Sequence, residues 1–295
     1  MTGRQAPSVA DKLRGLGYAP NARLLIVNGD DLGMCHAVNA GTFDALRHGV
    51  MTAASLMIPC PWAYMACAEV RADPTLDVGV HLTFTSEWDR YRWGPVSARD
   101  RCPSLVDRWD FFYPAEADVY AHADPHEVLV EGESQIERAL AWGLDPSHVD
   151  GHMSTLYAHP SLLPVYVRLA QRYRLPLRMA PRDMYAARGG AELYDAVSLD
   201  GLLTVDDLRF VELRDPPALR GQLLETLRTL QPGVTELAVH VAANTAEGEA
   251  IMRDLPARVE ALNLMLDGEI RAETNRLGIV LIGWRSLRDA QRGME

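Results

Sequence analysis

Short apolar runs alternate with helical patterns along most of the chain, and this alternation constrains the fold more than any other feature. It is typical of a parallel sheet whose strands are joined by helices packed on its faces. The expected strands cover residues 24–28, 53–59, 77–84, 147–152, 175–179, 234–243 and 278–284. A TIM-like barrel and a doubly wound sheet both fit this order of elements.

The 295 residues are enough for a single catalytic domain, 1–295, that begins with a polar lead-in at 1–22. Residues 85–124 show no clean periodicity and are long enough to form an insertion or a lid over a binding site. Residues 181–203 are expected to be an irregular loop. The expected helices cover residues 36–49, 62–72, 125–143, 160–174, 216–230 and 255–276.

The charge balance limits the class of partner. The chain has 29 Lys plus Arg against 40 Asp plus Glu, a formal net charge of −11. An acidic chain is not expected to bind a nucleic-acid backbone or an anionic membrane surface. No apolar run approaches the roughly 20 residues of a membrane span, and the first residues lack the apolar core of a secretory signal. A cytoplasmic location is therefore expected. The four cysteines form no C-x-x-C pair and are expected to be free thiols.

Polar side chains lie at or near the carboxyl ends of several expected strands, although the strands themselves are apolar. All strands of a parallel α/β fold point the same way, so their carboxyl ends meet at one rim, where such folds place their sites. This topology brings together six polar residues from distant parts of the chain. They are Asp30, Asp31, His81, His152, Arg178 and His240.

Taken singly, each of these residues has an ordinary structural explanation. A histidine on a strand, such as His81, is more often hydrogen-bonded than metal-bound. Asp31 can cap the helix that follows it, and Arg178 can pair with a structural carboxylate. Their co-occurrence at one rim favours a functional site over these explanations.

The adjacent carboxylates of Asp30 and Asp31 repel one another unless a cation or a proton relieves the repulsion. One carboxylate and two imidazoles make a three-ligand set for a catalytic divalent ion that keeps open positions, here Asp31, His81 and His152. Asp30 is then the candidate general base. His240, which approaches from another strand, can protonate a leaving group.

Six motifs, in order from about residue 24 to 285, resemble those of the YdjC-like carbohydrate deacetylase family. "VNGDDLGMCHAVNAG" resembles its N-A-D-D-[FL]-G motif, and "MTAASLM" resembles its V-T-S-x-S-L-M strand. "VGVHLTF" resembles its [LI]-G-x-H-[LF] strand. "HVDGHMSTLYAHP" resembles its H-[LI]-D-S-H element and is closer to the H-M-G-T branch than to the branch with a run of histidines. "LPLRM" and "TELAVHVA" are similar to its [IL]-P-x-R and E-x-x-x-H-P segments.

The resemblance implies a deformed TIM-like (β/α) barrel with parallel strands and one divalent metal ion held by one Asp and two His. It implies hydrolytic removal of an acetyl group from an N-acetylated sugar, and a homodimer. It assigns the same residues to the metal and to proton transfer as above, and it adds Arg178 as a rim residue near the base. Gly29 and Val241 stand where the family usually has Ala and Pro, and Met153 stands where the histidine-run branch has His.

The expected reaction is amide hydrolysis by metal-activated water on a small N-acetylated sugar or short oligosaccharide. Two imidazoles favour zinc, and magnesium or another divalent ion also fits. Four aromatic residues in 85–124 either supply flat faces for sugar rings or simply pack the loop onto the rim. They are Trp88, Tyr91, Trp93 and Trp109.

Three alternatives stay open. The same metal site can hydrolyse another acyl or ester substrate. A non-catalytic sugar-binding protein can retain the fold, although it has no need of a base such as Asp30 beside its metal. A purely structural metal site usually has four ligands and favours cysteine, and no cysteine occupies a ligand position of these motifs.

Overall fold

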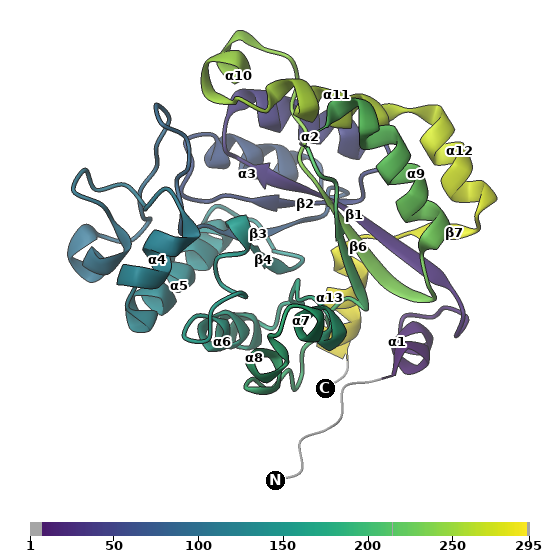
Figure 1. Ribbon diagram of the computed structural model, residues 1–295, viewed down its shortest axis with the longest axis horizontal. Coiled ribbons are helices and arrows are strands. Elements are labelled where there is room, and N and C mark those ends of the chain that lie inside the picture. Colours follow the sequence, from purple (N-terminus) through teal and green to yellow (C-terminus); the bar gives the residue numbers. More distant parts are fainter. Residues whose placement is uncertain (1–7, 214, 294–295) are drawn as a thin grey trace.

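The computed structural model describes residues 8–213 and 215–293, which form a curled parallel sheet with helices around it (Figure 1). The strand order is β4-β3-β2-β1-β6-β5, and β7 pairs with the beginning of β1. Every strand pairing in the described residues is parallel. The strands are β1 Arg23–Leu32, β2 Ala53–Leu56, β3 Val78–Leu82, β4 Val149–Gly151, β5 Asp207–Phe210, β6 Gly233–Val239 and β7 Ile279–Leu281. The expected barrel-like α/β class is confirmed.

Helices surround the sheet on several sides. Figure 1 shows α2, α3 and α11 above the strands, α9 and α12 to the right, α4 and α5 to the left, and α6 to α8 below. The helices are α1 Val9–Gly15, α2 His36–His48, α3 Ala63–Ala72, α4 Glu116–His122, α5 Pro125–Ala141, α6 Leu163–Tyr173, α7 Arg182–Ala187, α8 Ala191–Asp195, α9 Leu219–Thr229, α10 Ala246–Ile251, α11 Leu255–Leu266, α12 Gly268–Arg276 and α13 Trp284–Gly293.

The strand expected at 175–179 is wrong, because only single bridges form there. Leu177 bridges Val149 on one side and Thr204 on the other. Pro176 lacks a backbone N–H, so it cannot donate to a ladder and only its carbonyl is used, by the N–H of Val149. These bridges continue the curl of the sheet from β4 toward β5.

Other expectations about elements also need correction. The loop expected at 181–203 contains the short helices α7 and α8, which are too short to show a helical period. The helix expected at 255–276 is two helices, because the Asp267 side chain accepts a hydrogen bond from the N–H of Glu269 and begins α12. The sequence reasoning missed β5, a short and partly exposed strand with charged residues.

The segment 85–124 is anchored to the rest of the molecule at several points. The carboxylate of Glu131 in α5 accepts a hydrogen bond from the N–H of Val96 at 2.9 Å. The hydroxyl of Tyr91 donates to the carbonyl of Met34 at 2.6 Å, and the N–H of Ser104 donates to the carboxylate of Glu127 in α5 at 2.7 Å. Its role as a lid stays a prediction.

The apolar core continues below the sheet to both ends of the described chain. Leu13 of α1, Ile26 of β1 and Trp284 and Leu287 of α13 share one buried cluster. All four cysteines are buried and free, as expected, and burial raises the pKa of each thiol. Helix α1 lies within the expected lead-in, of which residues 1–7 lie outside the described residues.

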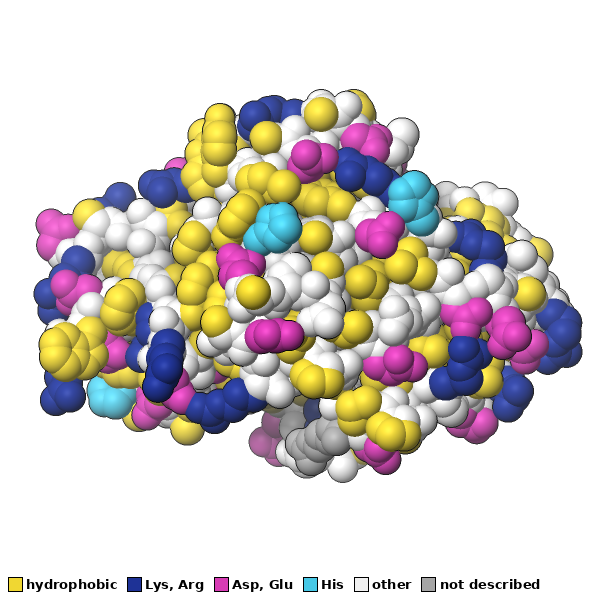
Figure 2. Space-filling model, turned by 90° about the horizontal axis from the view of Figure 1, so that it is seen from above, with side chains coloured by type: hydrophobic (Ala, Val, Ile, Leu, Met, Phe, Trp, Pro, Cys, Tyr) yellow, Lys and Arg dark blue, Asp and Glu magenta, His cyan; other side chains and the backbone are white. Residues whose placement is uncertain are grey.

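Acidic and basic side chains are interspersed over the face of the molecule drawn in Figure 2, with apolar side chains between them. Over residues 8–213 and 215–293, no helix combines the length and the apolar character that crossing a membrane requires.

Candidate metal centre

A bulge at the end of β1 places the two adjacent aspartates. Asn28 and Gly29 pair with Ala53 and Ala54 of β2, but the next pair is Leu32 with Leu56, so Asp30 and Asp31 together oppose one residue. In a regular strand, neighbouring side chains point to opposite faces. An extra residue changes that alternation and re-aims a side chain.

The backbone of Asp31 has a φ of 67°, in the left-handed region. A residue other than glycine pays about 1–2 kcal/mol for this conformation. Such strain persists where the surrounding structure fixes it, and it clusters at functional sites. The backbone conformation of Asp31 is therefore one observation that favours a functional site at the end of β1.

Asp31, His81 and His152 converge as a buried group, each from the carboxyl end of a different strand. Asp31 Oδ1 lies 3.2 Å from His152 Nδ1 and 3.6 Å from His81 Nε2. The topology thus brings together three residues that are far apart in sequence. The same contacts also allow plain hydrogen bonding, so their fit to a metal needs a separate test.

The geometry of this group fits a divalent ion. Ligand atoms about 2.0–2.2 Å from a tetrahedral ion lie about 3.3–3.6 Å from one another, close to the two distances measured from Asp31 Oδ1. This oxygen is buried and makes no well-aligned hydrogen bond within the described residues. A carboxylate and two imidazoles are a donor set suited to zinc and related ions.

A carboxylate lies at the far nitrogen of each of these histidines. His81 Nδ1 is 2.7 Å from Asp150 Oδ1, and His152 Nε2 is 3.0 Å from Glu87 Oε2. Metal-binding histidines usually donate their other N–H to such a partner, which fixes the tautomer and the ring orientation. Burial lowers the pKa of His152, but Glu87 and Asp31 outweigh it and raise that pKa to about 10. Carboxylates that attract a proton this strongly would attract a cation as well.

Arg258 of α11 binds the second oxygen of Asp31. Its Nη1 donates to Asp31 Oδ2 at 2.8 Å, and its Nε donates to Asp254 at 2.9 Å. Burial alone would raise the pKa of Asp31, but Arg258 and His152 hold that pKa well below its usual range. Asp31 is therefore ionised and available as a ligand through Oδ1.

Asp30 faces a different partner. Both of its oxygens accept hydrogen bonds at 2.7 Å from the guanidinium of Arg178, and Oδ1 also accepts one from Asn28 at 2.9 Å. Burial raises the pKa of Asp30, but Arg178 outweighs it and the pKa is lowered. Arg178 also contacts Glu236 at 2.7 Å and Asp150 at 3.0 Å, so one guanidinium serves three carboxylates.

His240 follows the end of β6 on the other side of Asp31. Its Nε2 is 3.9 Å from Asp31 Oδ2, and 28% of its side chain is exposed. Burial lowers the pKa of this imidazole, with Asp31 acting in the opposite direction. All six residues predicted from the sequence thus lie in one connected group.

The buried polar group carries an excess of negative charge. Its four carboxylates and two guanidinium groups leave a formal excess of two negative charges when the imidazoles are neutral, and a divalent ion would balance this excess. The charged members are Asp30, Asp31, Asp150, Glu236, Arg178 and Arg258.

Sequence reasoning assigned no role to several of these partners. Glu87 lies in the aperiodic segment after β3, and Arg258 lies within a helix, so neither has a strand-end signal. Asp150 ends β4 next to two histidines, and that position could have identified it. Glu236 sits at the start of a motif rather than at a strand end.

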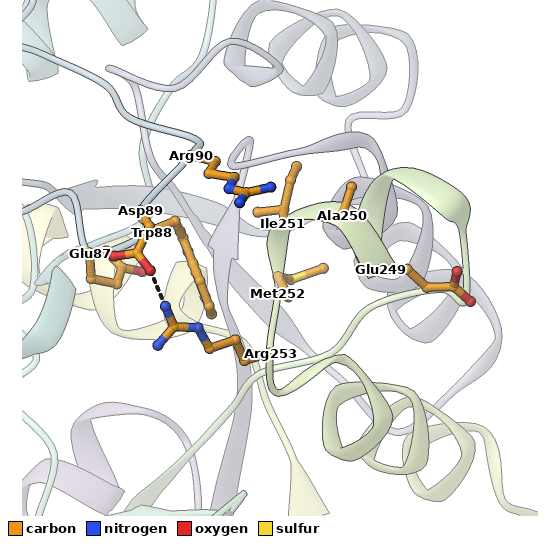
Figure 3. A pocket seen from close by; sticks show the side chains of 9 residues that line it. All are labelled: Glu87, Trp88, Asp89, Arg90, Glu249, Ala250, Ile251, Met252 and Arg253. Carbon is orange, nitrogen blue, oxygen red and sulfur yellow. Dashed lines mark hydrogen bonds and ion pairs between the residues drawn. The ribbon is translucent and has the colours of Figure 1, made fainter.

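A pocket of 370 Å³ adjoins this group (Figure 3). It lies between the segment Glu87–Arg90, which follows β3, and the segment Glu249–Arg253 at the end of α10. Trp88 lines the pocket, whereas Tyr91 donates to the carbonyl of Met34 at 2.6 Å. Trp109 is not among the residues that line this pocket, and 65% of it is exposed.

The chain resembles known proteins over most of its length. A protein-family model described as YdjC-like protein matches residues 24–276. A relative from Thermus thermophilus named carbohydrate deacetylase is 33% identical over 287 residues, covering 95% of this chain and 99% of the relative. One of the same name from Geobacillus stearothermophilus is 30% identical over 263 residues, covering 89% and 97%. A solved structure from Enterococcus faecalis V583, provisionally described as a cellobiose-phosphate cleavage protein, matches with a TM-score of 0.79 at 28% identity, covering 90% of this chain and 99% of that chain.

Proposed function

The chain belongs to the YdjC-like protein family, and from this premise we propose that it is a metal-dependent deacetylase that removes an acetyl group from an N-acetylated sugar. The observation that carries the proposal is the buried group of Asp31, His81 and His152, in which Asp31 Oδ1 has no hydrogen-bond partner among the described residues. Relatives that match this chain over nearly their whole length are named carbohydrate deacetylases. Both lines of support point to a hydrolase.

The ion is proposed to be held by Asp31 through Oδ1, by His81 through Nε2 and by His152 through Nδ1. These are the atoms that face one another in the buried group. Zinc is the proposed ion, because two imidazoles and one carboxylate suit it better than they suit magnesium. Three protein ligands leave positions open, as catalytic rather than structural sites do.

The chain's own residues divide the proton transfers between them. When bound, the ion would polarise the acetyl carbonyl and acidify a water enough for a carboxylate of low pKa to take its proton. Asp30, held ionised and oriented by Arg178, is proposed to accept that proton. His240 Nε2 lies 3.9 Å from the Asp31 carboxylate and 28% of its side chain is exposed, so His240 is proposed to protonate the departing amine when its imidazole carries a proton.

The test is acetate release from N-acetylglucosamine and its short oligomers. Each would be incubated with metal-stripped protein and then with zinc, manganese, cobalt or magnesium restored. Acetate that appears only with metal supports the proposal. If the protein binds one ion but releases no acetate from any sugar, it acts on another acyl or ester substrate or is a binding protein. Absence of any bound ion would contradict the assignment of the three ligands.

Asp30→Asn is expected to lower kcat by about 100-fold or more, because general-base catalysis contributes on this scale. Bound metal should be retained, since Asp30 is not one of the three proposed ligands and both of its oxygens are bound by Arg178. Asp118→Asn, on the distant helix α4, is the matched control and should keep full activity. Full activity in Asp30→Asn would remove this residue from the mechanism.

The expected homodimer and the cytoplasmic location stay predictions. Gel filtration with light scattering would test the first, and fractionation of the source cells would test the second.

A further inference from the structure

We propose that the pocket between Glu87–Arg90 and Glu249–Arg253 binds a pyranose ring of the substrate, with the indole of Trp88 as its flat platform. This inference rests on the proposed deacetylase function and adds to it the residue that positions the sugar. The pocket volume of 370 Å³ lies in the range of about 300–1,000 Å³ that is usual for small-molecule sites. It is formed by segments after β3 and β6, at the same rim as His81 and His240.

Trp88 is physically tied to the metal centre. The guanidinium carbon of Arg258 lies 6.0 Å from the centroid of the Trp88 ring, and Arg258 binds Asp31. Cation–π attraction therefore fixes the indole relative to a proposed ligand. The indole N–H of Trp88 is buried and has no partner in the described part of the chain. Because this N–H is not accessible from the pocket, the ring and not the N–H is the part of Trp88 that is proposed to contact the sugar.

The rest of the lining suits a sugar in chemical character. Figure 3 shows the Trp88 ring beside the ion pair of Asp89 and Arg253, with the Met252 side chain across from it. A pyranose has an apolar face formed by C–H groups, which packs on an aromatic ring, and hydroxyl groups at its edge, which bind charged side chains. Asp89, Arg253 and Arg90 place such groups at the pocket's rim.

An ion pair between Asp89 and Arg253 joins the two segments that line the pocket, as the dashed line in Figure 3 shows. Both side chains are largely exposed, 71% and 81% respectively. Exposed ion pairs contribute little stability, so a ligand can replace this pair at small cost. Each partner would exchange one charged contact for hydroxyl groups of the sugar.

Glu87 joins the pocket wall to the metal centre directly. It lines the pocket and also accepts from His152 at 3.0 Å. A sugar bound on Trp88 would therefore lie next to Glu87, the preceding residue, whose carboxylate orients the proposed metal ligand His152. Because of this contact, the pocket is connected to the proposed metal centre and is not an unrelated hollow on the surface.

The test compares Trp88→Ala, Trp88→Phe and Trp109→Ala in the metal-loaded protein. Trp88→Ala is expected to raise KM for the best N-acetylated sugar about tenfold, the scale of one aromatic contact. Trp88→Phe keeps a flat face and should recover most of the loss. Trp109→Ala removes an exposed tryptophan outside the pocket and should leave KM unchanged. Bound zinc per chain is measured for every variant, so that loss of metal is not mistaken for loss of sugar binding.

The outcomes separate this inference from the function on which it rests. Acetate release by the unaltered protein with an unchanged KM in Trp88→Ala would overturn the inference and leave the deacetylase intact. If the unaltered protein releases no acetate, titration calorimetry with the same sugars decides. Binding that is lost in Trp88→Ala would then support the pocket while the proposed reaction fails, and no binding would overturn both.

Discussion

The two oxygens of the Asp31 carboxylate face different kinds of group. Oδ2 accepts a hydrogen bond from Arg258, whereas Oδ1 faces the two histidines. Because the guanidinium occupies one oxygen, the carboxylate is held in one orientation with the other oxygen directed at the proposed metal position. Arg258 is thus a positioning residue for a ligand, and its charge also keeps Asp31 ionised.

Glu87 should control metal affinity through His152. Glu87→Ala removes the acceptor at His152 Nε2 and is expected to weaken zinc binding by about 10–100-fold, as is usual when such a partner of a ligating histidine is lost. Glu87→Gln keeps an acceptor oxygen and should lose less. The measurement is the zinc dissociation constant from competition with a chromophoric chelator.

Glu249→Ala is the control for Glu87→Ala. Glu249 is also a glutamate that lines the pocket, but it lies in α10. This variant should bind zinc as the unaltered protein does. Equal zinc affinity in Glu87→Ala and Glu249→Ala would show that the contact with His152 has no influence on the ion.

At the scale of elements, helix α2 packs unusually closely on the chain that follows β6. A Cβ atom at Gly41 would lie 2.8 Å from the backbone carbonyl carbon of Ala242 and 2.8 Å from the nitrogen of Ala243. These backbone atoms cannot move aside as the end of a flexible side chain can. The glycine therefore sets the distance between α2 and the segment that carries His240.

Gly41→Ala should lower the free energy of unfolding. Overpacking costs about 1–3 kcal/mol, which exceeds the gain of up to about 1 kcal/mol from helix propensity. Gly221→Ala in α9 is the matched control, because no atom outside its own helix and chain neighbours lies within 4 Å of the added carbon. It should stabilise the protein by roughly 0.5–1 kcal/mol. Urea unfolding measures the change in the free energy of unfolding for both variants, which should have opposite signs. Equal changes would mean that α2 can shift to accept the added carbon at residue 41.

The sequence predicts an element well where apolar residues recur regularly over a long segment or where a motif marks the end of a strand. Strands β1, β3 and β6 and helix α5 were expected close to their observed positions, and strand direction alone was enough to bring Asp31, His81 and His152 together. Glu87 and Arg258 could not be foreseen. Their positions depend on the path of an aperiodic segment and on the rotation of α11, which are set by tertiary packing and have no local signal.

For the whole molecule, the excess negative charge in the buried group links metal binding to stability. An ion that binds only the folded chain stabilises it by about 4 kcal/mol at a thousandfold excess over its Kd. Removing metal with EDTA should therefore lower Tm by roughly 10 °C relative to the zinc-loaded protein. Differential scanning calorimetry measures the shift.

Asp31→Asn tests whether this stabilisation comes from the proposed centre. It removes the charge of one ligand, so its Tm should respond much less to added zinc. A zinc response of the same size in this variant would place the stabilising ion elsewhere in the molecule.

The contacts of Asp30 run through the molecule to its last described helix. Asp30 binds Arg178, Arg178 binds Glu236, and the indole N–H of Trp284 in α13 donates to Glu236 at 3.2 Å. These four residues are translated at widely separated times. A nascent chain on the ribosome cannot complete the contacts that hold Asp30, the proposed base, until synthesis has passed residue 284. Chains released before Trp284 has been synthesised should therefore lack the deacetylase activity proposed above.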